Sequence, residues 1–188
     1  MSNRMDVVRV IIDLVTFRHN DDELIPKEIA IMDPDANCVS SWIVKPPCLW
    51  SELKPSVQKE NVWYTKNCHG VSWEDGELSY ESFRQTLMNY TEHASLLYCY
   101  GLETQMYLSR LLGRDVIDLK QMQCPKLSLL LSFPITSCCF PLHRLTRITC
   151  AVRNVHGLAK YLTYYDVHNS LFDSLTSTCD PCMTDSAC

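Results

Sequence analysis

The hydrophobic pattern begins with three short apolar runs that are separated by polar turns. The runs are rich in β-branched residues, and proline or clustered turn formers close them, which favours strands. They cover residues 9–17, 28–32 and 39–44. Because short turns join the consecutive runs, we predict an antiparallel meander of three strands.

The pattern then changes to alternating helices and strands. Apolar residues recur at helical spacing over 80–93, 103–112 and 150–164, and apolar segments at 96–100 and 115–119 indicate strands. Residues 48–76 are rich in aromatic side chains but have no clear period. This order predicts an α/β fold with a mixed sheet, in which three antiparallel strands precede parallel ones and helices flank the sheet. We expect one domain over residues 1–166 and a flexible polar tail over residues 167–188.

Composition narrows the setting of this domain. The formal net charge of the 188 residues is −5, so the chain has no overall basic field that would attract nucleic acid, although a local basic patch is possible. No run is apolar and long enough for a membrane helix, and the first ten residues lack the apolar core of a signal peptide. We therefore expect an intracellular protein, cytoplasmic or nuclear, with no membrane partner. The eleven cysteines are then buried thiols or metal ligands.

Two motifs in this element order resemble the DEDD-type 3′–5′ exonucleases. The strand Ile12-Asp13-Leu14-Val15 resembles their Asp-x-Glu strand, and His69-Gly70-Val71 resembles the His-Gly-Ile segment before their first helix. The resemblance implies a ribonuclease-H-like sheet. Val15 stands where the family has its glutamate, and Ile148 stands where the final His-x4-Asp motif, which would start at His143, has its aspartate.

The missing carboxylates bear on catalysis. These nucleases use two divalent ions, and hard ions such as Mg²⁺ need carboxylate oxygens. Only Asp13 keeps its family position, so we expect the ancestral hydrolytic site to be inactive and the protein not to be an enzyme. The alternative is a divergent metal-dependent exonuclease that holds Mg²⁺ or Mn²⁺ with Asp13, Glu103 and Asp118.

A second metal chemistry is indicated before the last predicted helix. Cys138, Cys139, His143 and Cys150 lie close together in the sequence, and thiolate and imidazole ligands suit Zn²⁺. Cys139, His143 and Cys150 would supply three ligands of a tetrahedral site. The fourth would have to come from the sheet.

The Maelstrom domain, a nuclease-dead relative of the DEDD fold, resembles this pattern. Pro26-Lys-Glu28-Ile29 matches the strand that carries its glutamate, and Cys150-Ala151 matches the start of its last helix. The resemblance implies a Glu-Cys-His-Cys zinc site formed by Glu28, Cys139, His143 and Cys150. The family usually has two residues between its Cys and His, whereas this chain has three or four, so Cys138 is an alternative to Cys139. Four protein ligands close the zinc shell, which makes such a site structural.

A binding surface is the third candidate feature. Arg144, Arg147, Arg153 and Lys160 cluster near the last predicted helix and could contact phosphates, and aromatic residues of 48–76 could stack on bases. The Maelstrom resemblance implies single-stranded RNA and the protein partners of an RNA-silencing complex, in small-RNA-mediated transposon silencing. A protein–protein interaction module that uses the acidic surface and the tail is the remaining alternative.

Overall fold

The sheet has five strands and defines the fold. The computed structural model describes residues 7–130 and 149–176, with side chains described as far as residue 169. The strands are β1 (Arg9–Arg18), β2 (Leu24–Asp33), β3 (Cys38–Ile43), β4 (Leu96–Cys99) and β5 (Ile117–Asp118), in the order β3-β2-β1-β4-β5. β1, β2 and β3 pair antiparallel, whereas β4 and β5 join in parallel. The predicted α/β class, a ribonuclease-H-like mixed sheet, is confirmed.

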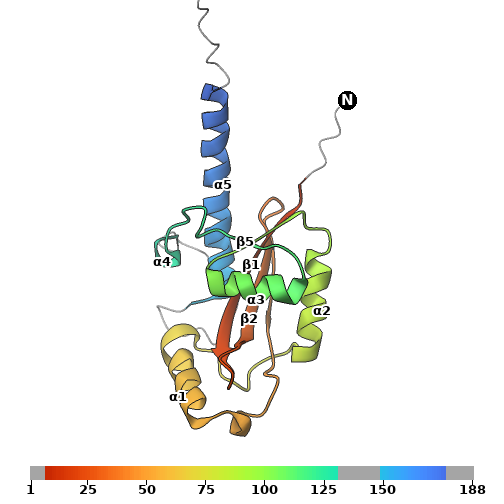
Figure 1. Ribbon diagram of the computed structural model, residues 1–188, viewed down its shortest axis with the longest axis vertical. Helices are drawn as coiled ribbons and strands as arrows, with labels where there is room; N and C mark the ends of the chain where they lie inside the picture. The colour runs from red at the N-terminus through yellow and green to blue at the C-terminus, as the bar shows by residue number, and fades with distance from the viewer. Residues whose placement is uncertain (1–6, 131–148, 177–188) are drawn as a thin grey trace, which may run out of the picture.

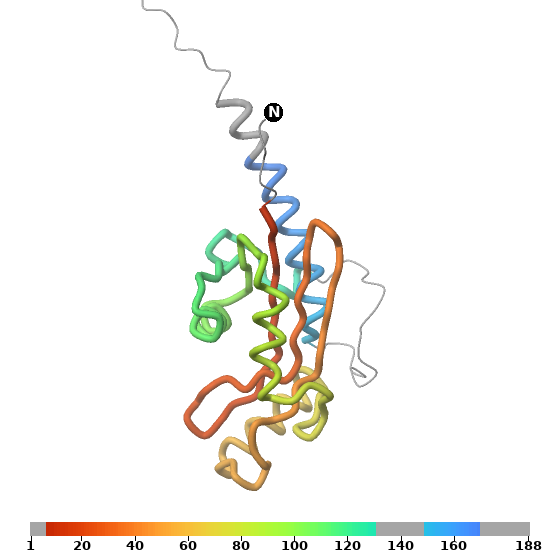
Figure 2. Tube along the Cα trace, turned by 90° about the vertical axis from the view of Figure 1, so that its right-hand side faces the viewer, coloured from red at the N-terminus to blue at the C-terminus, as the bar shows by residue number. Residues whose placement is uncertain are grey.

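Helices cover both faces of the sheet (Figures 1 and 2). The helices α2 (Tyr80–Thr91) and α3 (Leu102–Leu112) pack on one face, and α5 (Ala151–Thr176) packs on the other. Successive residues of a strand point to opposite faces, so Ile12 packs toward α2 and α3 whereas Ile11 packs toward α5. β1 is therefore buried on both sides, which agrees with its continuous apolar sequence.

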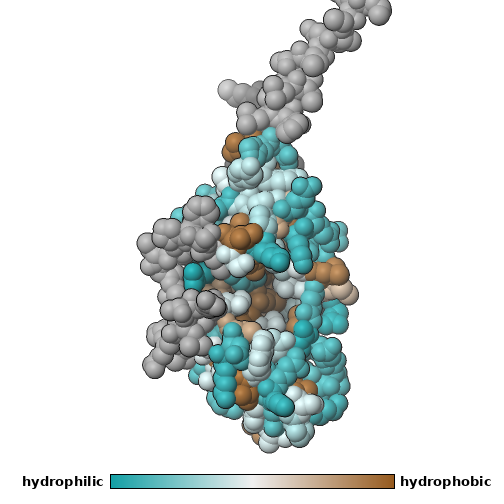
Figure 3. Space-filling model, turned by 90° about the vertical axis from the view of Figure 1, so that its left-hand side faces the viewer, coloured by the Kyte–Doolittle hydropathy of each residue, from teal (hydrophilic) through white to brown (hydrophobic). Residues whose placement is uncertain are grey.

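Local sequence explains where the helices begin and end. The Ser79 hydroxyl accepts a hydrogen bond from the Ser82 backbone N–H, which caps the start of α2. Gly113 ends α3 in the left-handed conformation, with φ 64°. On the face that Figure 3 shows, most exposed side chains are hydrophilic, and hydrophobic side chains gather in a hollow.

The aromatic-rich segment contains helices that the hydrophobic pattern does not predict. It forms a short 3₁₀ turn, η1 (Trp50–Glu52), then α1 (Pro55–Tyr64), which continues into a π-helical turn, η2 (Thr65–His69). α1 packs against β1 through Asn61, whose side-chain amide accepts from the Arg18 N–H and donates to the Arg18 carbonyl, both at 2.9 Å. A helix anchored by a polar residue has no apolar stripe, so no helical period is visible in its sequence. A further short helix, α4 (Leu127–Leu130), was also not predicted.

The last helix is longer than the pattern predicts. Its predicted end is residue 164, but α5 extends to Thr176, into the segment for which we expected a tail. No glycine or proline interrupts residues 158–176, so the helix can continue. The side chain of Asp166 also accepts a hydrogen bond from Arg9 at the start of β1, and Arg9 donates a second one to Asp35. After this contact, the last turns of α5 extend past the ends of the strands (Figure 1). Within the described ranges, no helix is both long and apolar enough to cross a membrane.

Candidate functional site

A cluster of buried polar side chains lies where α5 begins on the sheet. Asp13 of β1 and Glu28 of β2 are 4% and 0% exposed, and Asn154 of α5 is equally enclosed. The strand register places both carboxylates on the same face of the sheet, at diagonal positions, because Val15 pairs with Glu28 and Asp13 pairs with Ala30, two residues further along β2. Polar groups in such a position are costly to bury unless they are hydrogen-bonded or bind an ion.

The structure brings together two of the four predicted zinc ligands. The Cys150 Sγ lies 3.6 Å from the Glu28 Oε1, and both residues are fully buried. The other two predicted ligands, His143 and Cys139 or its alternative Cys138, lie outside the described residues. Across the described ranges, no three His, Cys, Asp or Glu side chains are grouped to hold a metal. The zinc site therefore stays a prediction, with half of its donor set adjacent and of the chemical types that Zn²⁺ binds.

The start of α5 is also tied to the π-helical turn. The Thr149 backbone N–H donates to the Cys68 carbonyl at 2.7 Å, so the residue before Cys150 is attached to η2. Gly70 ends η2 with φ 71°, and the buried ring of His69 packs edge-on against Phe17 at a centroid distance of 4.8 Å. The His-Gly-Val segment thus connects α1 and η2 to β1 and to the start of α5.

Asp13 has a partner that sequence reasoning missed. The Asn154 Nδ2 donates to the Asp13 Oδ2 at 2.8 Å. Burial raises the pKa of Asp13 to about 7, and the hydrogen bonds from Asn154 and from the Leu14 backbone offset this only in part. Asn154 lies four residues after Cys150, on the same side of a helix, and this spacing is the signal that could have identified it.

The carboxylates of the exonuclease alternative are used elsewhere. Glu103 is exposed and forms a two-pronged ion pair with Arg18, with N–O distances of 2.5 and 3.1 Å. Asp118 accepts hydrogen bonds from the Gly101 and Lys120 backbone N–H groups at 2.7 and 2.9 Å. Across the described residues, Asp13, Glu103 and Asp118 do not form a group of three carboxylates that could hold a metal ion, and the exonuclease alternative stays a hypothesis.

The described part of the predicted basic surface is a stripe on α5. Arg153 is half-buried and Lys160 is exposed, and their separation of seven residues places both on one side of the helix. His156 lies between them, and its pKa is lowered by burial and by the Lys160 charge. Arg144 and Arg147 lie outside the described residues.

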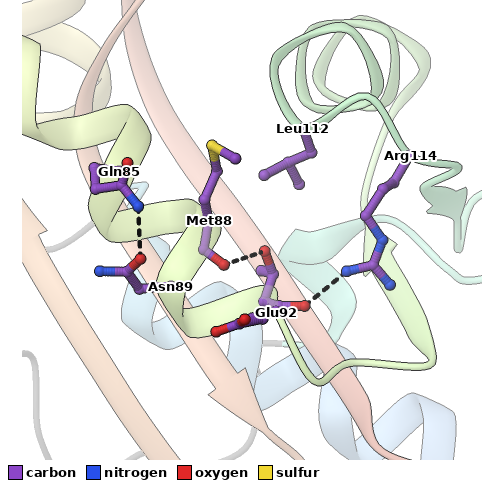
Figure 4. Close-up of a pocket in the computed structure, with 7 residues that line it drawn as sticks. Gln85, Met88, Asn89, Glu92, Leu112 and Arg114 are labelled. Atoms are coloured by element: carbon purple, nitrogen blue, oxygen red, sulfur yellow. Dashed lines mark hydrogen bonds between the residues drawn. The ribbon is translucent and has the colours of Figure 1, made fainter.

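A cavity of about 380 Å³ lies between α2 and the segment that follows α3 (Figure 4). Its polar side chains bond mainly to one another and to the backbone. Gln85 donates to Asn89 at 2.7 Å, and Arg114 donates to the Thr91 carbonyl at the end of α2, also at 2.7 Å. Arg114 thus satisfies the carbonyl of the last residue of α2, and this cavity provides no catalytic arrangement.

Comparison with known proteins does not assign a family. No protein-family model matches the chain, and no curated protein matches it. The functional argument therefore rests on the buried cluster and on the exposed surfaces.

Proposed function

We propose that this chain is a zinc-stabilised, catalytically degenerate exonuclease-like domain of the Maelstrom type that binds single-stranded RNA without cleaving it. The carrying observation is the buried contact between the Cys150 thiol and the Glu28 carboxylate at 3.6 Å. A thiol and a carboxylate are both zinc ligands, and here they join the residue before α5 to β2.

The zinc ion would be held by Glu28, Cys150, His143 and one of Cys139 and Cys138. Bound there, it would supply structural cross-linking and not hydrolysis, because four protein ligands leave no position for water. Its role would be to fasten the start of the last helix to the sheet, and its binding energy would add to the stability of the fold.

The enclosure of Asp13 argues against hydrolysis at the ancestral site. A two-ion nuclease needs ionised carboxylates that face hydrated metal and substrate. Asp13 is instead sealed between the sheet and α5, it is bonded to Asn154, and its pKa is raised to about 7. Asp13 therefore keeps the position of a nuclease carboxylate but is packed in the interior of the domain.

RNA binding would use cations on the outside of α5. Arg153 and Lys160 share one side of the helix, and the predicted neighbours Arg144 and Arg147 precede it in the sequence. Contacts with phosphates need only a few such side chains, even on a chain whose net charge is −5. A domain of this kind would serve as an RNA-binding scaffold, and we propose small-RNA-mediated silencing with its protein partners as the setting.

Metal analysis tests the zinc proposal. Protein purified without added metal is expected to carry one zinc ion per chain, and Glu28→Gln and Cys150→Ser are each expected to lose it. Cys124→Ser is the matched control, because Cys124 is also buried but belongs to no predicted ligand set. Wild-type protein without stoichiometric zinc would contradict the proposal.

A labelled oligonucleotide tests the absence of cleavage. We expect a single-stranded RNA to bind at low salt, to dissociate as salt rises, and to stay intact with Mn²⁺. Degradation that Asp13→Ala abolishes would favour the exonuclease alternative. No binding at low salt would favour the protein-interaction alternative.

A further inference from the structure

A second cavity, distinct from the buried cluster, lies in the aromatic-rich segment. Its volume is about 390 Å³, within the range of small-molecule sites. Trp50 of η1, Val62 of α1 and Trp73, which follows η2, form apolar walls. Such a lining suits a flat, aromatic ligand better than a charged one.

The walls of this cavity are held in place by the surrounding structure. The Trp73 ring packs edge-on against Trp50, at a centroid distance of 5.5 Å, and in a tilted arrangement against Phe17, at 5.4 Å. The fully buried Lys27 ammonium donates to the Trp73 carbonyl at 2.6 Å and to the Asp75 carbonyl beside it. A ligand would therefore meet a pre-formed surface, which lowers the entropic cost of binding.

The surface beside the cavity combines cations with an exposed aromatic ring. Lys59, Val62, Trp63 and Lys66 recur at the spacing of one helix face, and the Trp63 side chain is 55% exposed. Lysines interleaved with exposed aromatic rings are the combination by which proteins hold single strands, since bases stack on the rings and phosphates meet the cations.

The charges at the rim indicate which part of a nucleotide enters. Lys66 and Glu74 both line the cavity, so its mouth has no excess of positive charge. A neutral base fits this lining, whereas a phosphate would face the Glu74 carboxylate. The phosphates would lie outside, along Lys59 and Lys66.

We propose that this cavity, lined by Trp50, Val62 and Trp73, binds one base of a single-stranded RNA. The inference rests on the RNA binding proposed above and deepens it, because it adds a base-binding site on α1 to the phosphate contacts on α5. Trp63 offers a stacking surface to a neighbouring base.

The test measures the affinity of the full chain for a labelled oligouridine of about ten nucleotides, by fluorescence anisotropy at low salt. Trp50→Ala is expected to weaken binding roughly tenfold or more, as removal of a stacking ring does elsewhere. Trp50→Phe is expected to keep most of the affinity, because it keeps an aromatic wall. Lys66→Glu is expected to weaken binding more than Lys120→Glu, a matched charge reversal at another exposed lysine that does not line the cavity.

A second probe separates base from backbone. An abasic oligomer of the same length and charge is expected to bind wild-type protein more weakly than oligouridine. This comparison needs no variant, so it holds even if Trp50→Ala does not fold, and thermal unfolding checks each variant.

The outcomes distinguish the two proposals. If wild-type protein binds RNA but neither Trp50→Ala nor the abasic probe changes the affinity, the base-binding site is refuted and RNA binding stands. If Lys66→Glu and Lys120→Glu lowered the affinity for oligouridine equally, the loss would be due to the change in net charge and not to the cavity. If wild-type protein binds no oligouridine, both proposals fail, and an aromatic peptide side chain becomes the better candidate for the cavity.

Discussion

The two faces of the sheet use the same strands for different purposes. On one face, Ile12 and Ile29 meet apolar side chains of α2 and α3, such as Phe83. On the other, the carboxylates of Asp13 and Glu28 meet the polar side chains of α5. Both faces bury apolar side chains, which stabilises the fold. The face under α5 also buries the polar side chains of Asp13, Glu28 and Asn154, and burying polar groups lowers the net gain. The difference indicates that packing alone does not explain why these polar residues occupy the site under α5.

The largest expected effect is on the apolar face. Phe83→Ala leaves a cavity against the sheet and is expected to lower the free energy of unfolding by about 3–5 kcal/mol. Urea denaturation measures this loss, with the exposed Met88→Ala on the same helix as the control. A loss no larger than that of the control would mean that α2 does not carry the core.

The next effect concerns pH on the polar face. The pKa of Asp13 is raised in the folded state, so the folded protein holds this proton more tightly than the unfolded chain does. The free energy of unfolding is therefore expected to fall as pH rises from about 4 to about 7, by at most on the order of 4 kcal/mol, and then to level off.

Asp13→Asn removes this titration but keeps an acceptor for Asn154. The variant is expected to lack the decline and to be more stable than wild type at pH 8, as measured by denaturation across this pH range. If both proteins have the same profile, the Asp13 carboxylate is ionised in the fold, as a nearby cation would make it.

The smallest expected effect is at Glu103. Its ion pair with Arg18 is at the surface, so Glu103→Gln is expected to change the free energy of unfolding by no more than about 1 kcal/mol. It is also expected to leave RNA intact, like the wild type, with Mn²⁺ present. If the wild-type protein cleaved RNA and Glu103→Gln abolished this cleavage, the exonuclease alternative would be favoured instead.

Strong hydrophobic patterns made most of the fold predictable. The meander, the parallel strands and the helices α2 and α3 follow from periodicity and turn residues. α1 does not, because it docks through Asn61 to the backbone of Arg18, and a polar anchor leaves no period. The end of α5 was missed because polar residues without glycine or proline permit a helix as well as a tail.

The site was only partly predictable, for a related reason. Glu28 and Cys150 could be paired from sequence only through resemblance, since they are 122 residues apart. The role of Asn154 depends on which strand residue faces it, and this is set by the register of β1 and β2. Local sequence does not fix such long-range registers.

The span of these contacts also sets an order of assembly. Asp13 and Asn154 meet across 141 residues, whereas β1, β2 and β3 pair through neighbouring turns. Closing a long loop loses more chain entropy than closing a hairpin, so the meander is expected to form first and the α5 contacts last. During synthesis, we therefore expect Glu28 to lie on a nearly complete sheet before Cys150 emerges from the ribosome. Formation of this site is therefore expected to be a late step of folding.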